Sequence, residues 1–444
     1  MSGVSAPVRP VRRPLLTLSV VPILAALAVG GLGFATASIE HPDVVSKDAV
    51  DWTPHLAPGG GVDEPLGLAV GQLGDTTYLG GRFEFVQDAT RSTTVPRQNM
   101  VAFSASDGTI NATFVPTFDD AVYAILAVGD SVYVGGSFDD VNGQPRPALA
   151  KLDATTGALD PGFSPNGMSN SRVSEIRLVD GRLIVSGTFK KNIVALKPNT
   201  GGNTGFIDIP VDGRVELSVG KTDVYRFAVD HAVGATRLVA VGNFFAVGGR
   251  TQKRAFMLNL DGASATLSPW FYPPFQDQCE TRTPTRVAYL EDVDFSPDGS
   301  YFVFASTGFV VDVYPQQIGT HVCDAVARFE TDVLAPTEPT WINYTGGDTL
   351  HAVAATGAAV YVQGHNRWLD NPEGRDSMGL GAVVRRGIGA VDPETGVALP
   401  WNPRKPADQG GRDFLATPTG LWVPSDSLRF QGEDHHGIAF VPLP

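Results

Sequence analysis

Residues 132–163 decide the fold, and their sequence is VYVGGSFDDVNGQPRPALAKLDATTGALDPGF. We expect three strands here, at 133–138, 149–153 and 158–163, joined by a long polar loop and by a tight turn at 155–157. The first of them is rich in β-branched and aromatic residues, which favour strands, and its glycines suit places where neighbouring sheets crowd. A further strand is expected at 122–127, so that the unit contains four short strands.

The same pattern returns, with decay, about seven times between residue 38 and the C-terminus. Four short strands in about 45 residues are typical of a propeller blade, which buries both of its faces only between neighbouring blades. We therefore predict an all-β chain, in which residues 38–444 form a single β-propeller domain. Seven four-stranded blades fit the repeats best, with six or eight as the alternatives. The fifth repeat, at 286–344, and the seventh, shared between the two ends of the chain, depart most from the pattern.

The two ends of the chain have complementary gaps in this pattern. Residues 50–54, VDWTP, match the sequences that end two other repeats, at 160–165 and 399–403. The last repeat contains only three expected strands, at 414–416, 421–423 and 437–441. We therefore expect the N-terminal strand to complete the C-terminal blade and to cover its open edge. Trp52 should then lie close to Phe440.

Several short motifs carry a resemblance to a known family. They are residues 133–138, Asn142-Gly143, Arg146, Leu152-Asp153 and the Thr156-Gly157 turn, with weaker copies at 78–83, 184–189 and 241–244. With these motifs the chain resembles the secreted bacterial β-propellers of the delta-60-repeat type, especially those exported by actinobacteria. The resemblance covers nearly all of residues 38–444 and implies the fold. It implies no catalytic residues, because the family is functionally uncharacterised.

Residues 1–37 have the composition of an export signal. Arg9, Arg12 and Arg13 precede an apolar segment at 15–34, and residues 35–37, Ala-Thr-Ala, form a small-x-small cleavage site. An uncleaved membrane anchor is the alternative, since the apolar run is nearly long enough to span a bilayer. We expect cleavage, a secreted mature chain and no membrane span after removal of the signal. The Sec and Tat export routes both stay open.

The charge of the mature chain limits its partners. The formal net charge is -14, and residues 1–37 contain three arginines and no acidic residue, so residues 38–444 carry -14 - 3 = -17. A surface of this sign repels phosphate backbones, which argues against nucleic acid as a partner. Solubility outside the cell explains the same charge without any partner.

The chain contains two cysteines, Cys279 and Cys323. In an exported protein such a pair predicts one disulfide. Neither cysteine belongs to a CxxC motif or to another pattern of a structural zinc site, so we expect no zinc.

Loop length distinguishes the two faces of the predicted propeller. In a four-stranded blade the loops after strands two and four share one face, and here these loops are the long ones. Long ordered loops usually carry function, so we expect the long-loop face to be the interaction face. The long loops are residues 84–98, 139–147, 245–254, 274–285, 311–323 and 369–386.

An arginine recurs late in the loops between strands two and three: Arg97, Arg146, Arg254 and Arg386. Guanidinium groups bind carboxylates and sulfates bidentately, so these residues are candidates for ligand binding at the channel mouth. The alternative is a structural role, in which each arginine holds its own loop. Recurrence in every repeat favours the structural role.

The sixth repeat has the most elaborate loop and supplies four more candidates for ligand binding, His365, Arg367, Trp368 and Asp370. Trp368 offers a face for a sugar ring, with Arg367 and Asp370 beside it for hydroxyl groups; burial of Trp368 in the core is the alternative. Asp370 and the acidic residues that follow it are oxygen ligands of the kind that Ca²⁺ takes, but their spacing is not that of an EF-hand. We expect no cofactor and no metal, with Ca²⁺ as the weaker alternative.

No linear catalytic motif is present: the sequence lacks GxSxG, HExxH and a Walker loop. We therefore expect a secreted, monomeric and non-enzymatic propeller that recognises a protein or a carbohydrate at the cell surface through its long-loop face. The alternative is an extracellular hydrolase or lyase, with or without Ca²⁺, whose site lies at the central channel mouth. A cell-envelope spacer without a ligand is a third hypothesis.

Overall fold

The computed structural model describes residues 1, 3, 39–216, 218, 220–230, 237–277, 279, 290–308, 318–335, 337–374, 376–406 and 410–444. The chain divides into two units, Met1–Leu32 and Gly33–Pro444, and the strands given below belong to the second. Apart from residues 1 and 3, the expected export signal lies outside the described residues. No helix in the described part of the chain is long and apolar enough to cross a membrane.

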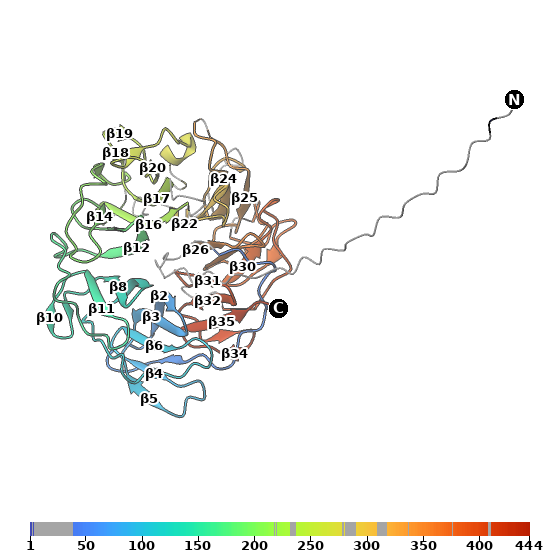
Figure 1. Cartoon of the computed structure of the whole chain (residues 1–444). Coiled ribbons are helices and arrows are strands. Elements are labelled where there is room, and N and C mark those ends of the chain that lie inside the picture. The colour runs from blue at the N-terminus through green and yellow to red at the C-terminus, as the bar shows by residue number, and fades with distance from the viewer. Residues whose placement is uncertain are drawn as a thin grey trace. The chain divides into compact units, whose positions relative to one another are not determined.

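Antiparallel sheets of consecutive strands build the second unit (Figure 1). In the described residues the only helical element is the 3-10 turn Pro273–Gln276, so the prediction of an all-β chain is confirmed. Seven main sheets, each named below by its first strand, are β2(Leu66–Leu73)-β3(Thr76–Arg82)-β6(Met100–Ser104), β7(Val122–Val128)-β8(Ser131–Gly136)-β11(Leu149–Asp153), β12(Val173–Val179)-β13(Arg182–Gly187)-β14(Ile193–Leu196), β16(Asp223–Val229)-β17(Arg237–Asn243)-β20(Ala255–Asn259)-β21(Thr266–Leu267), β22(Leu290–Phe295)-β23(Tyr301–Ser306)-β24(Ala325–Glu330)-β25(Trp341–Tyr344), β26(Leu350–Ala355)-β27(Val360–Gly364)-β30(Ile388–Val391) and β31(Leu415–Thr417)-β32(Gly420–Pro424)-β35(Ile438–Pro442).

The fourth strand is shorter than the sequence predicts. In the described residues, only the β16 and β22 sheets contain a fourth strand among the main sheets. The β22 sheet is formed by the fifth repeat, which is therefore more regular than expected. In the β7 sheet the strand expected at 158–163 is a single bridge, Leu152 to Leu159. Asp160 N–H still donates to the Lys151 carbonyl, but Pro161 follows and has no N–H to continue the ladder. Similar single bridges join Phe103 to Ile110, Leu196 to Asn203, and Val391 to Ala398.

Five of the loops between second and third strands are hairpins in the described residues, whereas much of the expected long loops at 274–285 and 311–323 lies outside them. In the β7 sheet, Asn142 and Gly143 have φ angles of 52° and 70° and form the two-residue turn that the sequence predicts for Asn-Gly. Two of the hairpins also pair with strands that precede their sheet, β1(His55–Ala57) and β15(Val211–Asp212). The hairpins are β4(Phe85–Gln87)-β5(Thr94–Pro96), β9(Asp140–Val141)-β10(Gln144–Pro145), β18(Ala246–Val247)-β19(Arg250–Thr251), β28(Trp368–Leu369)-β29(Val383–Val384) and β33(Arg429–Phe430)-β34(Glu433–Asp434).

The hydrophobic core lies between neighbouring main sheets. One cluster joins Tyr78 of the β2 sheet to Val134 of the β7 sheet, and the next joins Tyr133 to Ile176 of the β12 sheet. The sheets approach so closely that a Cβ atom on Gly135 would lie 2.6 Å from Cγ1 of Val173. The glycines of the repeat are therefore required by packing.

The N-terminal segment runs beside the C-terminal strand. Ser46 N–H donates to the Pro442 carbonyl at 2.8 Å, and Val50 N–H donates to the Phe440 carbonyl at 3.0 Å. The rings of Trp52 and Phe440 are stacked with their centroids 6.0 Å apart, as expected for neighbours. The two hydrogen bonds do not extend into a regular strand, which the sequence had predicted at 50–54.

Cys279 and Cys323 form the predicted disulfide, and both are buried. The bridge joins the segment that follows the 3-10 turn to the segment that precedes β24.

Candidate functional site

The first strands of six main sheets carry the same irregularity near their start. In each, one residue is skipped in the pairing with the second strand, which is a β-bulge. A bulge re-aims the side chain of the skipped residue. These bulge residues are Leu68, Tyr123, Ser174, Tyr225, Glu291 and His351, and all of them line one cavity of about 470 Å³. Arg412, which precedes β31 in the seventh sheet, lines the same cavity. In Figure 1 the labelled first strands β2, β12, β16, β22, β26 and β31 lie toward the middle of the view.

The cavity opens on the side of the hairpins. Leu66, at the start of β2, pairs with Arg82, at the end of β3, and both line the cavity. The hairpin β4-β5 follows directly from Arg82. The cavity therefore lies on the long-loop side of the sheets, where the sequence predicted an interaction face.

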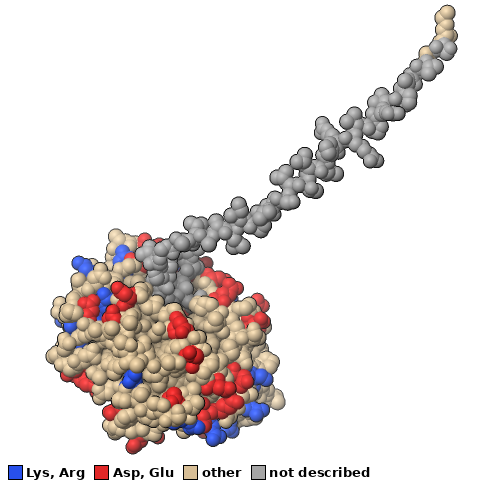
Figure 2. All heavy atoms as spheres, turned by 60° about the horizontal axis from the view of Figure 1, so that its bottom comes forward, with Lys and Arg blue, Asp and Glu red and all other residues tan. Residues whose placement is uncertain are grey.

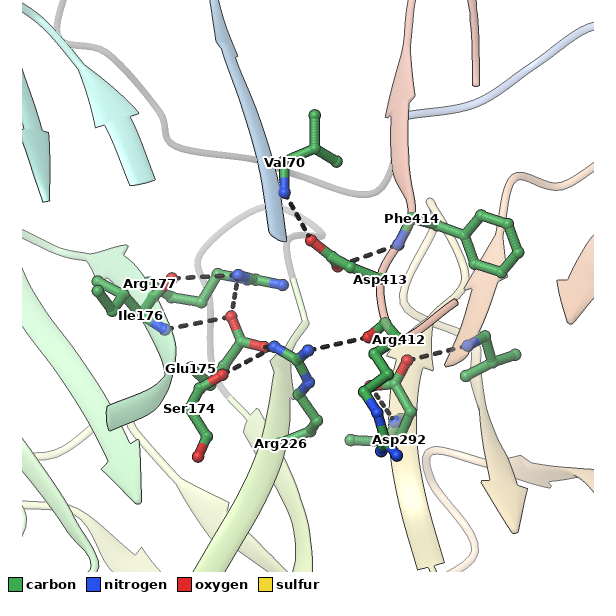
Figure 3. A network of polar contacts seen from close by, with 12 residues as sticks. Val70, Ser174, Glu175, Ile176, Arg177, Arg226, Asp292, Arg412, Asp413 and Phe414 are labelled. Atoms are coloured by element: carbon green, nitrogen blue, oxygen red, sulfur yellow. Dashed lines mark hydrogen bonds and ion pairs between the residues drawn. The ribbon is translucent and has the colours of Figure 1, made fainter. Parts of the chain in front are cut away.

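Arg226 crosses the cavity and lines it (Figure 3). Its guanidinium group donates to the Ser174 carbonyl at 2.7 Å and to Glu175 Oε2 at 3.0 Å. Another donor of the same group reaches the Arg412 carbonyl at 2.9 Å. Burial alone lowers the pKa of Arg226, but the surrounding carboxylates, Glu175 foremost, outweigh burial and raise it. Arg226 is therefore a fixed positive charge.

Two carboxylates beside the cavity join neighbouring sheets. Asp292, the residue after the bulge in β22, accepts a hydrogen bond from Val353 N–H of β26 at 2.9 Å. Asp413 accepts one from Val70 N–H of β2 at 3.0 Å. Burial raises the pKa of Asp292 well above its usual range and that of Asp413 to about 6, although Arg226 opposes both shifts. Asp413 therefore adds little negative charge below pH 6, and the raised pKa of Asp292 also favours its neutral form.

Arg172 lines the cavity between β7 and β16. It donates to Ser174 Oγ at 3.0 Å and to Asp223 Oδ2 at 2.5 Å, and its guanidinium carbon lies 5.4 Å from the centre of the Tyr123 ring. Burial raises the pKa of Asp223 to about 6, and the charge of Arg172 opposes this shift. The Arg172 side chain is therefore held in place by groups of its own protein.

Glu291 is the carboxylate among the lining residues. Its Oε2 lies 3.7 Å from His351 Nδ1 and 3.8 Å from Arg412 Nη1. Burial raises the pKa of Glu291, but His351, Arg412 and Arg172 together outweigh burial and lower it, so that Glu291 is ionised at neutral pH. Burial, followed by the charges of Glu291 and Asp223, raises the pKa of Tyr225, which therefore stays protonated.

The four recurring arginines predicted from the sequence lie away from this cavity. Arg97 donates to the Asn111 carbonyl at 2.9 Å, Arg146 to the Phe163 carbonyl and Arg254 to the Phe275 carbonyl at 2.5 Å. Each thereby ties its hairpin to the segment that follows the third strand. In the sixth repeat the equivalent residue is Arg385, which donates to the Leu399 carbonyl at 2.5 Å. Arg386 is exposed.

The other candidates of the sixth repeat are not among the residues that line the cavity either. Arg367 donates to Asp348 Oδ1 at 2.7 Å and stacks on the half-buried ring of Trp368 at 4.3 Å. Asp370 accepts from Ala398 N–H at 3.1 Å. His365 lies nearest to the cavity, because its ring centre is 5.3 Å from that of His351. Among the described residues no group of His, Cys, Asp and Glu side chains is arranged for a metal ion.

The bulge residues were not predicted, although the sequence contains a signal for them. Each is a single residue near the start of a first strand, and its type changes from sheet to sheet while the position before it stays apolar or small. In five sheets the bulge residue follows a buried valine or leucine: Val122, Val173, Val224, Leu290 and Leu350.

Comparison with known proteins agrees with this architecture. Residues 130–163 match the family described as "Domain of unknown function (DUF5122) beta-propeller". This part of the chain is therefore similar to a repeat of an uncharacterised β-propeller family. No curated protein matches the sequence. A solved structure titled "Crystal structure of the computationally designed Ika8 protein: crystal packing No.1 in P63" is similar at 10% identity with a TM-score of 0.41, over 88% of this chain and 98% of that one.

Proposed function

We propose that this protein is a secreted, non-enzymatic binding propeller whose long-loop side takes a glycan or a protein segment into the cavity lined by the bulge residues. One observation carries the proposal: six sheets place the same bulge at the same point, and the side chain at that point differs from sheet to sheet. Where a position has a structural role, the same residue type recurs in different sheets. Glycine recurs where sheets pack closely, as at Gly80 and Gly135, and arginine recurs where a hairpin is held by a backbone carbonyl, as at Arg97 and Arg146. A recognition surface needs different side chains at positions that share the same backbone geometry, and the six bulges provide such positions.

The finer architecture belongs to this proposal. We infer that the seven main sheets are seven blades and that residues 41–54 join the last blade to the first. The meander order of every sheet and the contacts of successive first strands support this inference, as do the hydrogen bonds from Ser46 and Val50 to β35. Joined ends leave no open sheet edge, which suits a monomer.

Secretion is part of the same proposal. The disulfide between Cys279 and Cys323 suits an oxidising compartment, and the composition of residues 1–37 suits export. The resemblance to the secreted delta-60-repeat propellers of actinobacteria points the same way. A partner at the cell surface follows from this location.

An extracellular hydrolase or lyase at the same cavity is the second candidate, with or without Ca²⁺. It is favoured by Glu291 and His351, whose Oε2 and Nδ1 atoms lie 3.7 Å apart, and by Tyr225, which lines the same cavity. The raised pKa of Tyr225 disfavours it as the group that abstracts a proton. Both nitrogens of His351 are buried, which shields them from a substrate in this conformation. Binding without turnover therefore fits the cavity better.

A binding experiment with residues 38–444 tests the proposal. The protein and the double variant Tyr123→Ala/Tyr225→Ala are applied to a glycan array and used for pull-downs from cell-surface extracts, with Arg386→Ala as the matched control on an exposed hairpin. We expect the control to bind like the parent and the double variant to lose binding while keeping its unfolding temperature within a few degrees. Equal binding by all three proteins contradicts the proposal, and release of cleaved glycan supports the second candidate.

A further inference from the structure

The arginines of the cavity differ in how their charge is compensated. Arg172 is paired with Asp223 at 2.5 Å and Arg226 with Glu175 at 3.0 Å, so these two are neutralised by groups of the protein. Arg412 has only the ion pair with Glu291 at 3.8 Å, and its guanidinium group makes no hydrogen bond to a described residue. Arg82 makes neither a hydrogen bond nor an ion pair within the described part of the chain, although it lines the same cavity.

This arrangement is unusual for the chain in which it occurs. The formal net charge is -14, and acidic side chains are more widespread than basic ones on the face shown in Figure 2. The cavity nevertheless has four arginines and one carboxylate among its lining residues. Arg172 and Arg226 are compensated by Asp223 and Glu175, so the positive charge that remains for a bound anion is that of the exposed residues Arg82 and Arg412.

We propose that the ligand in this cavity presents a carboxylate, as an acidic glycan does, and that Arg82 and Arg412 hold that group. The inference rests on the proposed function and restricts the class of ligand to molecules that present a carboxylate. The two arginines belong to the β2 and β31 sheets, which contact each other through β2 and β32. A guanidinium group offers a planar pair of N–H donors that matches the two oxygens of a carboxylate.

The remaining walls suit the body of a sugar. Tyr123 and Tyr225 are half-buried bulge residues, and Leu66 and Leu68 line the cavity beside Arg82. Aromatic rings with a polar tip provide both an apolar surface and a hydrogen-bonding group. A volume of about 470 Å³ lies within the range of pockets that bind small molecules, so the cavity suits one or two sugar units of a chain.

Calorimetric titration tests this inference with residues 38–444. The probes are an oligogalacturonate, the same oligosaccharide with its carboxylates reduced to neutral alcohols, and a sulfated neutral oligosaccharide of equal length. The variants are Arg82→Gln, Arg412→Gln and, as a matched control on an exposed hairpin, Arg386→Gln. Each probe is titrated at low and at high salt.

We expect the carboxylated probe to bind the parent at least about tenfold more tightly than the neutral probe, because only a charged probe forms charge-assisted hydrogen bonds with the two arginines. We also expect it to bind more tightly than the sulfated probe, because a planar carboxylate matches the planar guanidinium group better than a tetrahedral sulfate does. Arg82→Gln and Arg412→Gln should each weaken binding by about tenfold and reduce its salt dependence, whereas Arg386→Gln should not. Tighter binding of the neutral or the sulfated probe overturns the inference but leaves a glycan-binding propeller. Absence of binding by all three probes overturns the inference, and the proposed function fails separately if the glycan array and the pull-downs also find no ligand.

Discussion

The guanidinium group of Arg226 donates a hydrogen bond to the carbonyl oxygen of Arg412 at 2.9 Å and thereby joins β16 to the segment before β31 (Figure 3). The same side chain pairs with Glu175 of β12, and the two side chains are 12% and 6% exposed. One buried arginine thus links three main sheets and forms part of the wall of the cavity. Arg226 therefore contributes both to the contacts between sheets and to the shape of the cavity.

Replacement of Arg226 should destabilise the protein strongly. Arg226→Met leaves the buried Glu175 with Arg177 as its remaining charged partner, so we expect a loss that approaches but does not exceed the about 3–5 kcal/mol typical of a buried charge left unpaired. The double variant Glu175→Gln/Arg226→Met should recover part of this loss, because the buried carboxylate that Arg226 compensates is removed with it. Urea unfolding measures both effects.

The exposed ion pair of Lys191 and Asp208 provides the matched control, since its side chains are 49% and 74% exposed. Lys191→Ala should change the free energy of unfolding by less than about 1 kcal/mol. A similar small change for Arg226→Met would show that the buried network contributes nothing.

The hairpin arginines should act on stability and not on binding. Arg254 is 1% exposed and donates to the Phe275 carbonyl, so Arg254→Ala leaves that carbonyl without its donor and a cavity in the core. We expect a loss of about 2–4 kcal/mol in the free energy of unfolding. Arg386→Ala should stay within about 0.5 kcal/mol of the parent. Unchanged stability of Arg254→Ala together with lost ligand binding would instead assign these arginines to the ligand.

The disulfide should contribute measurably to stability. It closes a loop with a sequence separation of 44 residues between Cys279 and Cys323. In the chain-entropy model a loop of this length is worth on the order of 4 kcal/mol. Cys279→Ala/Cys323→Ala, or reduction of the parent, should therefore lower the unfolding temperature by several degrees in a thermal melt. A melt that is insensitive to both treatments would contradict this expectation.

His55 should make stability fall in acid. Its Nδ1 accepts a hydrogen bond from the His436 N–H at 3.1 Å, and its Nε2 lies 3.2 Å from the Ala89 carbonyl, so the neutral ring is fully bonded. Burial, followed by the charge of His436, lowers its pKa from 6.5 to about 4, and His435 and Arg91 act in the same direction. The unfolded chain then binds the proton more readily than the folded one.

The contribution of His55 is therefore complete above pH 6.5 and is lost as the pH falls from 6.5 to about 4. Urea unfolding at several pH values between 7 and 4 measures this slope. His55→Gln should flatten it, although His41, His435 and His436, whose pKa values burial also lowers, keep part of it. An identical slope in the variant would exclude His55 as its source.

The strand pattern was predictable because it depends on local chemistry. The Asn142-Gly143 turn, the glycine at 135 and the strands of residues 132–153 follow from turn geometry and close packing, which leave their mark in neighbouring residues. The short fourth strands were less predictable, since a single proline after Asp160 decides where the ladder ends.

The candidate site was not predictable in the same way. Its residues, from Tyr123 in β7 to Arg412 before β31, lie far apart in the sequence and meet only because each sheet has its bulge at the same point. The prediction from loop length pointed to the side of the sheets on which the cavity lies, and it emphasised hairpin residues such as Arg146, whose guanidinium group binds the backbone. Bulges leave a weak signal in the sequence, because the skipped residue is free to be of any type.

The most direct test of the central claim is a crystal structure of residues 38–444 soaked with a short oligogalacturonate. The account predicts electron density for a sugar inside the cavity between Tyr225 and Arg412, with its carboxylate bonded to Arg82 and Arg412. Density on the outer hairpins, with the cavity holding only solvent, would contradict the claim that the bulge residues form the binding site.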